Sequence, residues 1–370
     1  MATLGLVMIV KNEQETLPRL AASVIDHIDH YTILDTGSTD DTIAVAREVF
    51  GNIPGEVLQD EWRGFGPSRN VALDAAIPHT DWVLTLDADD VFEGARPDLD
   101  IDLDGLEAMY HYNQLAYTHL RVIRSTAGFR WVGRAHEYLT IPGRQPRLQL
   151  TNAFRVHHMA DGGMRATKWE REIELLEADF ADDPTSARTA FYIARSYDDA
   201  KRYQEAIDWY TRRLALDGWD QEDWYAAWRL GVMLLAADEP DEGCGVLWSA
   251  WNRRPWRAEP LVTLAEHYRL TSQWMLSWEA CDLAFRRCGA LPNPAPVEVH
   301  GRGDRLFVHV DVYEWRIAYE QSIAAYYAGE QARGRELTDY LLARTDLPEN
   351  IRASVEDNAK FYPALGRVPR

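Results

Sequence analysis

Three acidic residues follow an apolar run that has the length of a β-strand. Residues 82–86 are apolar apart from one threonine, and Asp87, Asp89 and Asp90 come directly after them. Such a run, bounded by turn residues, predicts a buried strand whose carboxyl end projects its acids into a ligand-binding crevice. Asp87 and Asp89 offer the hard oxygen ligands that suit Mg²⁺ or Mn²⁺ carrying substrate phosphates. For an isolated Asp-x-Asp, the alternative is a solvated acidic turn.

Two earlier strand-like runs also end in polar residues. Residues 4–10 are followed by a polar segment that ends in Glu13, and residues 31–34 are followed by Asp35. Because open α/β sheets bind ligands at the carboxyl ends of their strands, one shared site explains Glu13, Asp35 and the later acids together.

Helical segments alternate with these runs. Apolar spacing predicts a helix over residues 16–27, a second helix that ends near residue 50 and is capped by Ser38 or Thr39, and a third capped by Ser68. This alternation predicts right-handed βαβ units, a mostly parallel sheet and an α/β fold class.

Composition and charge limit the class of protein. A chain of 370 residues forms one large domain or two, and its net charge of -20 argues against a broad surface for nucleic acid or anionic membrane. Cys244, Cys281 and Cys288 have no metal-binding or redox spacing, and so few cysteines fit a reducing, cytoplasmic compartment. Residues 4–10 are too short to span a membrane and follow no basic residues, so we expect neither a signal peptide nor a membrane helix.

A basic segment interrupts this acidic chain. Between residues 121 and 165, eight arginines are accompanied only by the acids Glu137 and Asp161. This bias suggests an arginine-lined anionic site, and the alternative is that the arginines cover edge strands. The eight are Arg121, Arg124, Arg130, Arg134, Arg144, Arg147, Arg155 and Arg165.

From about Thr167 the pattern becomes continuously helical. Three approximate copies of the helix-packing positions of a tetratricopeptide repeat begin near Ala190, Ala227 and Leu261, at roughly the 34-residue spacing of that repeat. Three stacked helix pairs suffice for a stable solenoid. After them we expect a loop over residues 292–305 and closing helices over residues 315–342 and 349–362. The sequence therefore predicts an α/β domain over residues 1–165 and a helical domain over residues 166–370.

Four segments occur in an order that resembles family 2 glycosyltransferases, which have a GT-A fold. The segments are Met8–Glu13, Leu34–Thr42, Ser68–Leu73 and Leu86–Asp90. The subgroup with tetratricopeptide-like helices behind the catalytic domain is most similar. Gly133–Glu137 resembles its Gly-x-x-His-Glu segment, and His157 or His158 resembles its later histidine.

The resemblance implies transfer of a sugar from a nucleotide diphosphate donor, with a uridine diphosphate sugar favoured, and a Mn²⁺ or Mg²⁺ cofactor. A metal there neutralises charge on the departing diphosphate. Asp35 is expected to accept a hydrogen bond from the base, unless it only bonds its own turn, and Arg69 to hold the diphosphate through its forked donors. The expected donor-binding residues are Val10, Asn12, Glu13, Asp35, Gly37, Arg69, Asp87 and Ala88. The expected metal ligands are Asp87, Asp89 and either His157 or His158.

Family 2 enzymes generally invert the anomeric centre, which requires a base that takes the acceptor's proton. Glu137 is the candidate, and His136 is expected to position it. The alternatives are that Asp90 is the base, or that Glu137 forms a structural ion pair with a nearby arginine.

Two other classes of function compete with this interpretation. A nucleotidyltransferase also uses acids and Mg²⁺ at strand ends, but it usually has a Gly- and Arg-rich loop where this chain has Lys11, Asn12 and Glu13. A non-catalytic scaffold would bind peptides with its helices and retain a degenerate transferase domain. The acceptor is open between a protein, a saccharide, a lipid-linked sugar and a modified nucleic acid. We expect the helical domain to recruit that acceptor or to form a homodimer.

Overall fold

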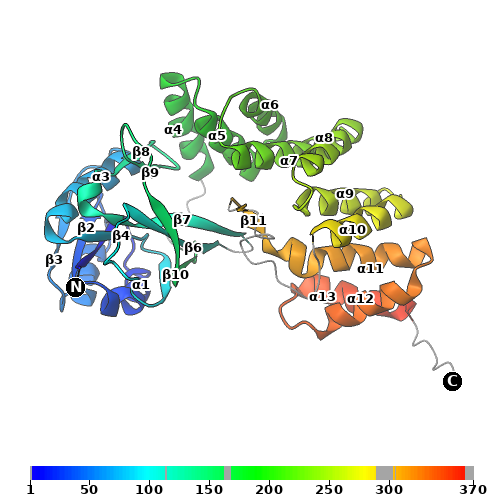
Figure 1. The fold of residues 1–370 in the computed structure, drawn as a ribbon, viewed down its shortest axis with the longest axis horizontal. Coiled ribbons are helices and arrows are strands. Elements are labelled where there is room, and N and C mark those ends of the chain that lie inside the picture. Colours follow the sequence, from blue (N-terminus) through cyan, green and yellow to red (C-terminus); the bar gives the residue numbers. More distant parts are fainter. Residues whose placement is uncertain (1, 113–114, 162–167, 289–302, 305, 363–370) are drawn as a thin grey trace. The chain divides into compact units, whose positions relative to one another are not determined.

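The computed structural model describes residues 2–112, 115–161, 168–288, 303–304 and 306–362 (Figure 1). The chain divides into two compact units, Met1–Ala200 and Lys201–Arg370. The first unit contains the whole α/β region. It also includes the first two helices that follow that region, α4 (Lys168–Asp182) and α5 (Ala187–Asp199). Each unit is described below by itself.

Eight strands of the first unit form a mixed β-sheet. In spatial order they are β3 (Gly55–Gln59), β2 (His30–Asp35), β1 (Leu4–Val10), β4 (Trp82–Thr85), β7 (Leu115–Arg124), β6 (Gly105–Tyr112), β10 (Leu148–His158) and β5 (Asp90–Gly94). The first four run parallel, which confirms the predicted parallel core. Beyond β4 the sheet is mixed, since β7 runs antiparallel to both β4 and β6, and β5 antiparallel to β10.

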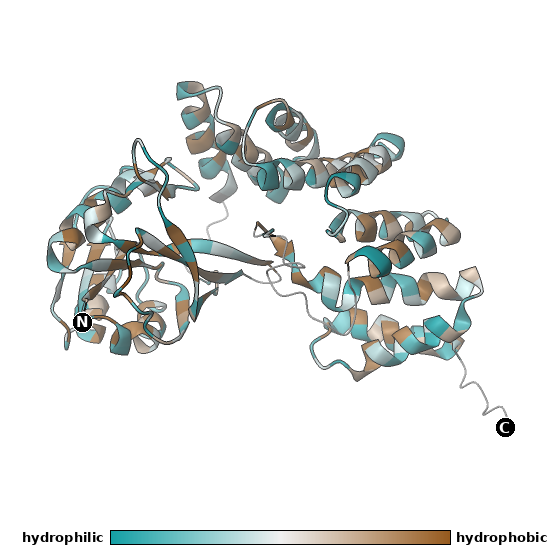
Figure 2. Cartoon of the chain, viewed as in Figure 1, coloured by the Kyte–Doolittle hydropathy of each residue, from teal (hydrophilic) through white to brown (hydrophobic). Residues whose placement is uncertain are grey.

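Helices cover both faces of the parallel part (Figure 1). On one face lie α1 (Leu17–Val24) and α2 (Thr42–Val49), and on the other lie α3 (Phe65–Ala76) and the hairpin of β8 (Arg130–Val132) and β9 (Tyr138–Thr140). Alternation along β1 serves both cores, because Leu6 and Met8 face α1 while Val7 faces α3. The strands are accordingly rich in hydrophobic residues (Figure 2).

The predicted helix caps are wrong. Helix α2 begins at Thr42, after both Ser38 and Thr39, and the Thr42 backbone N–H donates to Asp40 Oδ1 at 3.1 Å. Helix α3 begins before Ser68, which therefore lies inside its first turns. Ser38 and Thr39 instead connect two loops at the carboxyl edge of the sheet.

Helix pairs build the second unit. They are α6 (Tyr203–Leu214), α7 (Asp220–Ala236), α8 (Pro240–Arg253), α9 (Glu259–Leu270), α10 (Trp274–Cys288), α11 (Ile317–Ala328), α12 (Gln331–Ala343) and α13 (Glu349–Asn358). The three predicted repeats coincide with α5–α6, α7–α8 and α9–α10, so the tetratricopeptide-like pattern is confirmed. The single helix expected over residues 315–342 is instead α11 and α12, because Gly329 adopts φ +83° and ends α11. The loop expected over residues 292–305 lies largely outside the described residues.

Within the described part of the chain, none of the helices combines the length and the apolar character that a membrane span requires.

Close packing of the α7–α8 hairpin gives a test of this architecture. A Cβ atom at Gly231 would lie 2.6 Å from Leu247 Cγ, whereas one at Gly245 meets nothing within 4 Å. We expect Gly231→Ala to lower the free energy of unfolding by about 1–3 kcal/mol through overpacking. Gly245→Ala, the matched control, should raise it by about 0.5–1 kcal/mol. Urea titrations followed by circular dichroism measure both, and equal stabilities would contradict the packing described.

Candidate active site

The acids that follow β4 form a tight turn into β5. The Asp90 backbone N–H donates to the Asp87 carbonyl at 3.0 Å, and the Asp87 N–H donates to Asp90 Oδ2 at 2.9 Å. Asp89 lies between them, and its carbonyl accepts the Met159 N–H at 3.0 Å. The turn thus fixes the backbone of Asp89 from both sides, at the carboxyl edge of β4.

Asp90 is the fully buried member of this turn. Its Oδ1 accepts the Tyr110 hydroxyl at 3.0 Å and lies 2.9 Å from His158 Nδ1, and Arg121 Nη2 lies 3.7 Å from its Oδ2. A buried carboxylate needs such partners to offset the cost of desolvation. Both oxygens of Asp90 therefore have partners within the protein.

The two histidines at the end of β10 point in different directions. His158 Nδ1 lies 3.5 Å from Asp89 Oδ1 as well as beside Asp90. His157 Nε2 lies 2.6 Å from Glu93 Oε2, and its ring stacks on His111 with centroids 5.1 Å apart. Of the two candidates, only His158 is brought to the acids, because successive side chains of a strand face opposite sides.

Asp89, Asp90 and His158 are the described residues whose arrangement could hold a metal, since their ligand atoms lie within 4.8 Å of one another. Burial raises the pKa of Asp89, and Asp87 and Asp90 add to the shift while His158 opposes it. A divalent cation would relieve this crowding of negative charge. Because Asp90 is committed to its partners, Asp89 and His158 are the residues that would bind the ion. With Nδ1 donating to Asp90, Nε2 would be the nitrogen of His158 that holds the ion, and Asp90 would orient the imidazole, as carboxylates commonly do behind metal-bound histidines.

Asp87 turns away from this cluster toward Arg69. Arg69 Nη2 donates to Asp87 Oδ1 at 2.5 Å, and Arg69 Nε donates to Glu137 Oε1 at 2.6 Å. Although burial opposes ionisation, the positive charges of Arg69 and Arg121 hold the pKa of Asp87 below its usual range. Arg69 is therefore a bridge between the strand end and Glu137, and this pairing agrees with the structural ion pair considered as an alternative for Glu137.

His136, which directly precedes Glu137 in the sequence, contacts helices rather than the acid turn. His136 Nε2 lies 2.7 Å from Glu172 Oε1, and its ring stacks on Tyr192 at a centroid distance of 4.1 Å. These contacts tie His136 to α4 and α5, and none of its contacts among the described residues reaches the acid turn.

Asp35 has one oxygen in its own turn and one without a partner. Its Oδ1 accepts the backbone N–H groups of Gly37 and Ser38, each at 3.0 Å. Its Oδ2 is buried and has no hydrogen-bond partner among the described residues. Gly37 adopts φ +101°, which a side chain would strain. A buried acceptor without a partner is costly, so Oδ2 fits a donor group supplied by a ligand.

Residues of the first loop lie at the same edge. Asn12 adopts φ +59°, and its Oδ1 accepts the Thr39 N–H at 2.8 Å. The Val10 carbonyl accepts the Thr36 N–H at 2.9 Å. Burial raises the pKa of Glu13, and the charges of Asp89 and Asp87 raise it further. A hydrogen bond from Thr16 acts in the opposite direction.

Ala88 is also buried, in the acid turn. The structure therefore brings the predicted donor-binding positions to one edge of the sheet.

The arginine-rich segment does not line one anionic site. Acids from other parts of the chain neutralise its members, which sequence alone could not reveal. Arg144 donates to both oxygens of Asp104 at 2.7 and 3.0 Å, and Arg147 to both oxygens of Asp102 at 2.9 and 3.0 Å. Other described pairs are Arg121–Asp90, Arg130–Asp74, Arg134–Asp179 and Arg155–Glu93. Arg165 lies outside the described residues.

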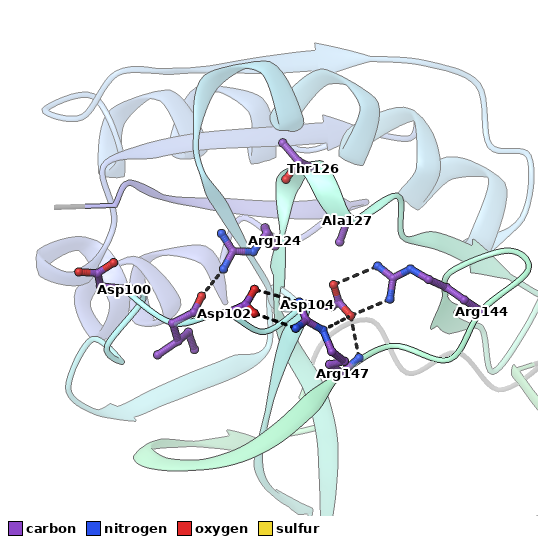
Figure 3. A pocket seen from close by; sticks show the side chains of 9 residues that line it. Asp100, Asp102, Asp104, Arg124, Thr126, Ala127, Arg144 and Arg147 are labelled. Atoms are coloured by element: carbon purple, nitrogen blue, oxygen red, sulfur yellow. Dashed lines mark hydrogen bonds and ion pairs between the residues drawn. The ribbon is translucent and has the colours of Figure 1, made fainter.

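Several of these ion pairs line an open cavity of about 630 Å³ (Figure 3). Arg124, which donates to the backbone carbonyls of Ile101 and Leu103, belongs to its wall. In the pairing of β7 with β4, Arg124 lies opposite Trp82 at the start of β4, whereas the acid turn follows the end of that strand. The cavity therefore lies at the opposite edge of the sheet, and its charges are balanced internally.

Comparison with known proteins agrees with this geometry. Residues 6–98 match the model of Glycosyl transferase family 2. This segment of the first unit therefore resembles a family 2 glycosyltransferase domain, the mixed sheet is GT-A-like, and tetratricopeptide-like helices follow it in the sequence.

Individual relatives cover this arrangement in part. A TPR repeat-containing protein of Synechococcus elongatus is 33% identical over 208 residues, which are 50% of each chain. The SPbeta prophage-derived glycosyltransferase SunS of Bacillus subtilis is 22% identical over 224 residues, 56% of this chain and 52% of the relative. The chain thus spans about half the length of these relatives. A solved structure of MamA covers 52% of this chain and 92% of its own, at 16% identity and a TM-score of 0.35.

Removal of the Arg69 bridge should destabilise the first unit. Arg69→Met would leave Asp87 and Glu137 without their cation, which we expect to cost about 3 kcal/mol of unfolding free energy. Because the pKa of Asp87 is lowered in the folded protein, its contribution is present above the unfolded pKa of about 4 and is lost as pH falls. Urea titrations between pH 7 and pH 3 should therefore show the difference from wild type shrinking, and a difference that grows toward low pH would contradict the bridge.

Proposed function

We propose that this protein is a metal-dependent, inverting glycosyltransferase that uses a uridine diphosphate sugar as donor. The observation that carries the proposal is the placement of the Asp89–His158 pair and the unpaired Asp35 oxygen at the same edge of the sheet, where β2 and β4 end on either side of β1. The family 2 match to residues 6–98 supports the same reaction class.

The base of the donor is recognised by Asp35 in this proposal. Its unpaired Oδ2 can only accept a hydrogen bond while the carboxylate is ionised. Uracil and guanine offer a ring N–H to such an acceptor, whereas cytosine and adenine present a ring nitrogen acceptor at the corresponding edge. Uridine therefore fits this oxygen better than cytidine or adenosine.

Asp89 and His158 would hold a Mg²⁺ or Mn²⁺ ion near the donor's diphosphate. The ion would neutralise charge on the leaving diphosphate as a Lewis acid. The chain's own contribution is to fix these ligands, since Asp90 holds the His158 ring and Arg69 keeps Asp87 ionised beside the cluster. Water or an acceptor hydroxyl would then attack the anomeric carbon as the bond to the diphosphate breaks.

Glu137 is the proposed base for that attack. Its Oε1 is occupied by Arg69, so Oε2 is the oxygen that would take the proton. Only 10% of its side chain is exposed, which limits competition from bulk water. His136 and the loop around it would hold Glu137 in place.

The helical unit is proposed to bind the acceptor or a second copy of the chain. It exposes large aromatic side chains, among them Trp219, Tyr327 and Phe361. The acceptor could be a protein, a saccharide, a lipid-linked sugar or a modified nucleic acid.

A screen of nucleotide sugars by thermal shift, with and without Mn²⁺, tests the donor and metal together. We expect a uridine diphosphate sugar to stabilise the wild type more strongly when Mn²⁺ is present. Asp89→Ala and His158→Ala should each weaken metal-supported binding by about 10-fold or more. His157→Ala is the matched control and should keep the Mn²⁺ effect, since His157 contacts Glu93 instead. An unchanged Mn²⁺ effect in Asp89→Ala and His158→Ala would remove these ligands from the proposal.

Donor hydrolysis with water as acceptor tests the base. Glu137→Gln should lower turnover by about 10²–10⁴, because the amide cannot take the proton. Donor affinity should persist, since the amide oxygen can still accept from Arg69. Release of uridine diphosphate measures turnover and calorimetry measures affinity. Near-normal turnover would exclude Glu137 as the base, and an equal loss of affinity would make it a structural partner of Arg69.

A further inference from the structure

The loop over residues 133–137, which carries Glu137, is fastened to the start of helix α3. The Phe65 backbone N–H donates to the Arg134 carbonyl at 3.1 Å. A Cβ atom at Gly66 would lie 2.3 Å from the Gly133 carbonyl oxygen, so only glycine allows this approach. Arg69, the partner of Glu137, belongs to the same helix.

The same loop is fastened to helix α4 on its other side. Asp179 Oδ2 accepts the Arg134 backbone N–H at 2.8 Å, and Asp179 Oδ1 accepts the Arg134 side chain at 2.7 Å. Asp182 also accepts from Arg134, at 2.9 Å. Both the backbone and the side chain of Arg134 in the loop are therefore held by the helix that follows β10 in the sequence.

A second connection runs through Glu172. Its Oε1 lies 2.7 Å from His136 Nε2 and accepts the Ser196 hydroxyl at 2.6 Å. Its side chain is only 13% exposed. Because Ser196 belongs to α5, Glu172 joins α4, α5 and the loop at one point.

The loop adopts a backbone conformation that needs such support. Gly133 adopts φ +100°, and His136 adopts φ +47°, which is uncommon for a residue with a side chain. Conformations of this kind persist when the surroundings fix them. The stacking of His136 on Tyr192 of α5 adds to the contacts that hold it.

We infer that Glu172 is a positioning residue for the reaction, acting through His136 on Glu137. The inference rests on the proposed function. It assigns the α4–α5 hairpin to the machinery that orders the catalytic carboxylate, although the hairpin lies beyond the segment that matches the family model. A misplacement of a catalytic group by about 1 Å can cost about 10²-fold in rate.

Three full-length variants test this role by hydrolysis of a uridine diphosphate sugar with Mn²⁺. Glu172→Ala should lower turnover about 10-fold or more and change the donor KM less than about threefold, because Asp35, Asp89 and His158 lie outside the loop. Glu172→Gln should restore most of the turnover, since its amide oxygen can take the place of Oε1 and accept from both His136 and Ser196.

Glu177→Ala is the matched control. Glu177 accepts the Tyr197 hydroxyl at 2.7 Å, so it also joins α4 to α5, and the structure shows it no bond to the loop. Its loss should lower the melting temperature and leave turnover within about twofold of wild type.

A double-variant cycle tests the route of action. If Glu172 acts through His136, the double variant Glu172→Ala, His136→Ala should be no slower than His136→Ala alone. Normal turnover of Glu172→Ala, or an equal loss in Glu177→Ala, would overturn the inference while leaving the proposed function intact. A wild-type protein without donor hydrolysis would overturn both.

Discussion

The buried carboxylate of Asp90 is the constraint on which the rest of the site depends. It receives hydrogen bonds from the backbone of its own turn and from Tyr110, and it lies beside His158 and Arg121. These partners come from β6, β10 and β7, so one charge connects three strands to the acid turn. An unpaired charge at this depth would be strongly destabilising, which makes the arrangement of its partners close to obligatory.

The other acids divide into those that hold the structure and those left for a ligand. Asp87 is neutralised by Arg69, whereas Asp89 has the imidazole of His158 nearby and a pKa raised mainly by burial. Asp35 combines both uses in a single side chain, with one oxygen in its turn and one unpaired. The site therefore leaves a few acids without a neutralising arginine and pairs the other acids with one. Such an arrangement suits a divalent cation that carries a diphosphate.

Local features of the chain could be predicted from sequence, and choices between distant partners could not. The strand before the acid turn, the parallel core and the helix pairs follow from hydrophobic periodicity and turn residues within short windows. The reversal of the chain into β5 at Asp90 is not evident from sequence, because five residues carry too little periodicity to show a strand. The arginine bias suggests an anion site in sequence alone, because the partners of these arginines, such as Asp104 for Arg144, come from another segment. The choice between His157 and His158 required the register of β10.

That register has a consequence for how the chain tolerates changes in length during evolution. The pairing of β10 with β6 is interrupted between Leu150 and Arg155, while residues 154–158 pair without interruption with β5. The interrupted stretch is a bulge that separates two parts of β10, each of which is paired with its own neighbours. A residue gained or lost there changes the size of the bulge and leaves His158 paired opposite Asp90. We therefore expect a change in length at residues 151–152 to be tolerated better than the same change two residues before His158, which would turn the imidazole to the wrong side of the sheet.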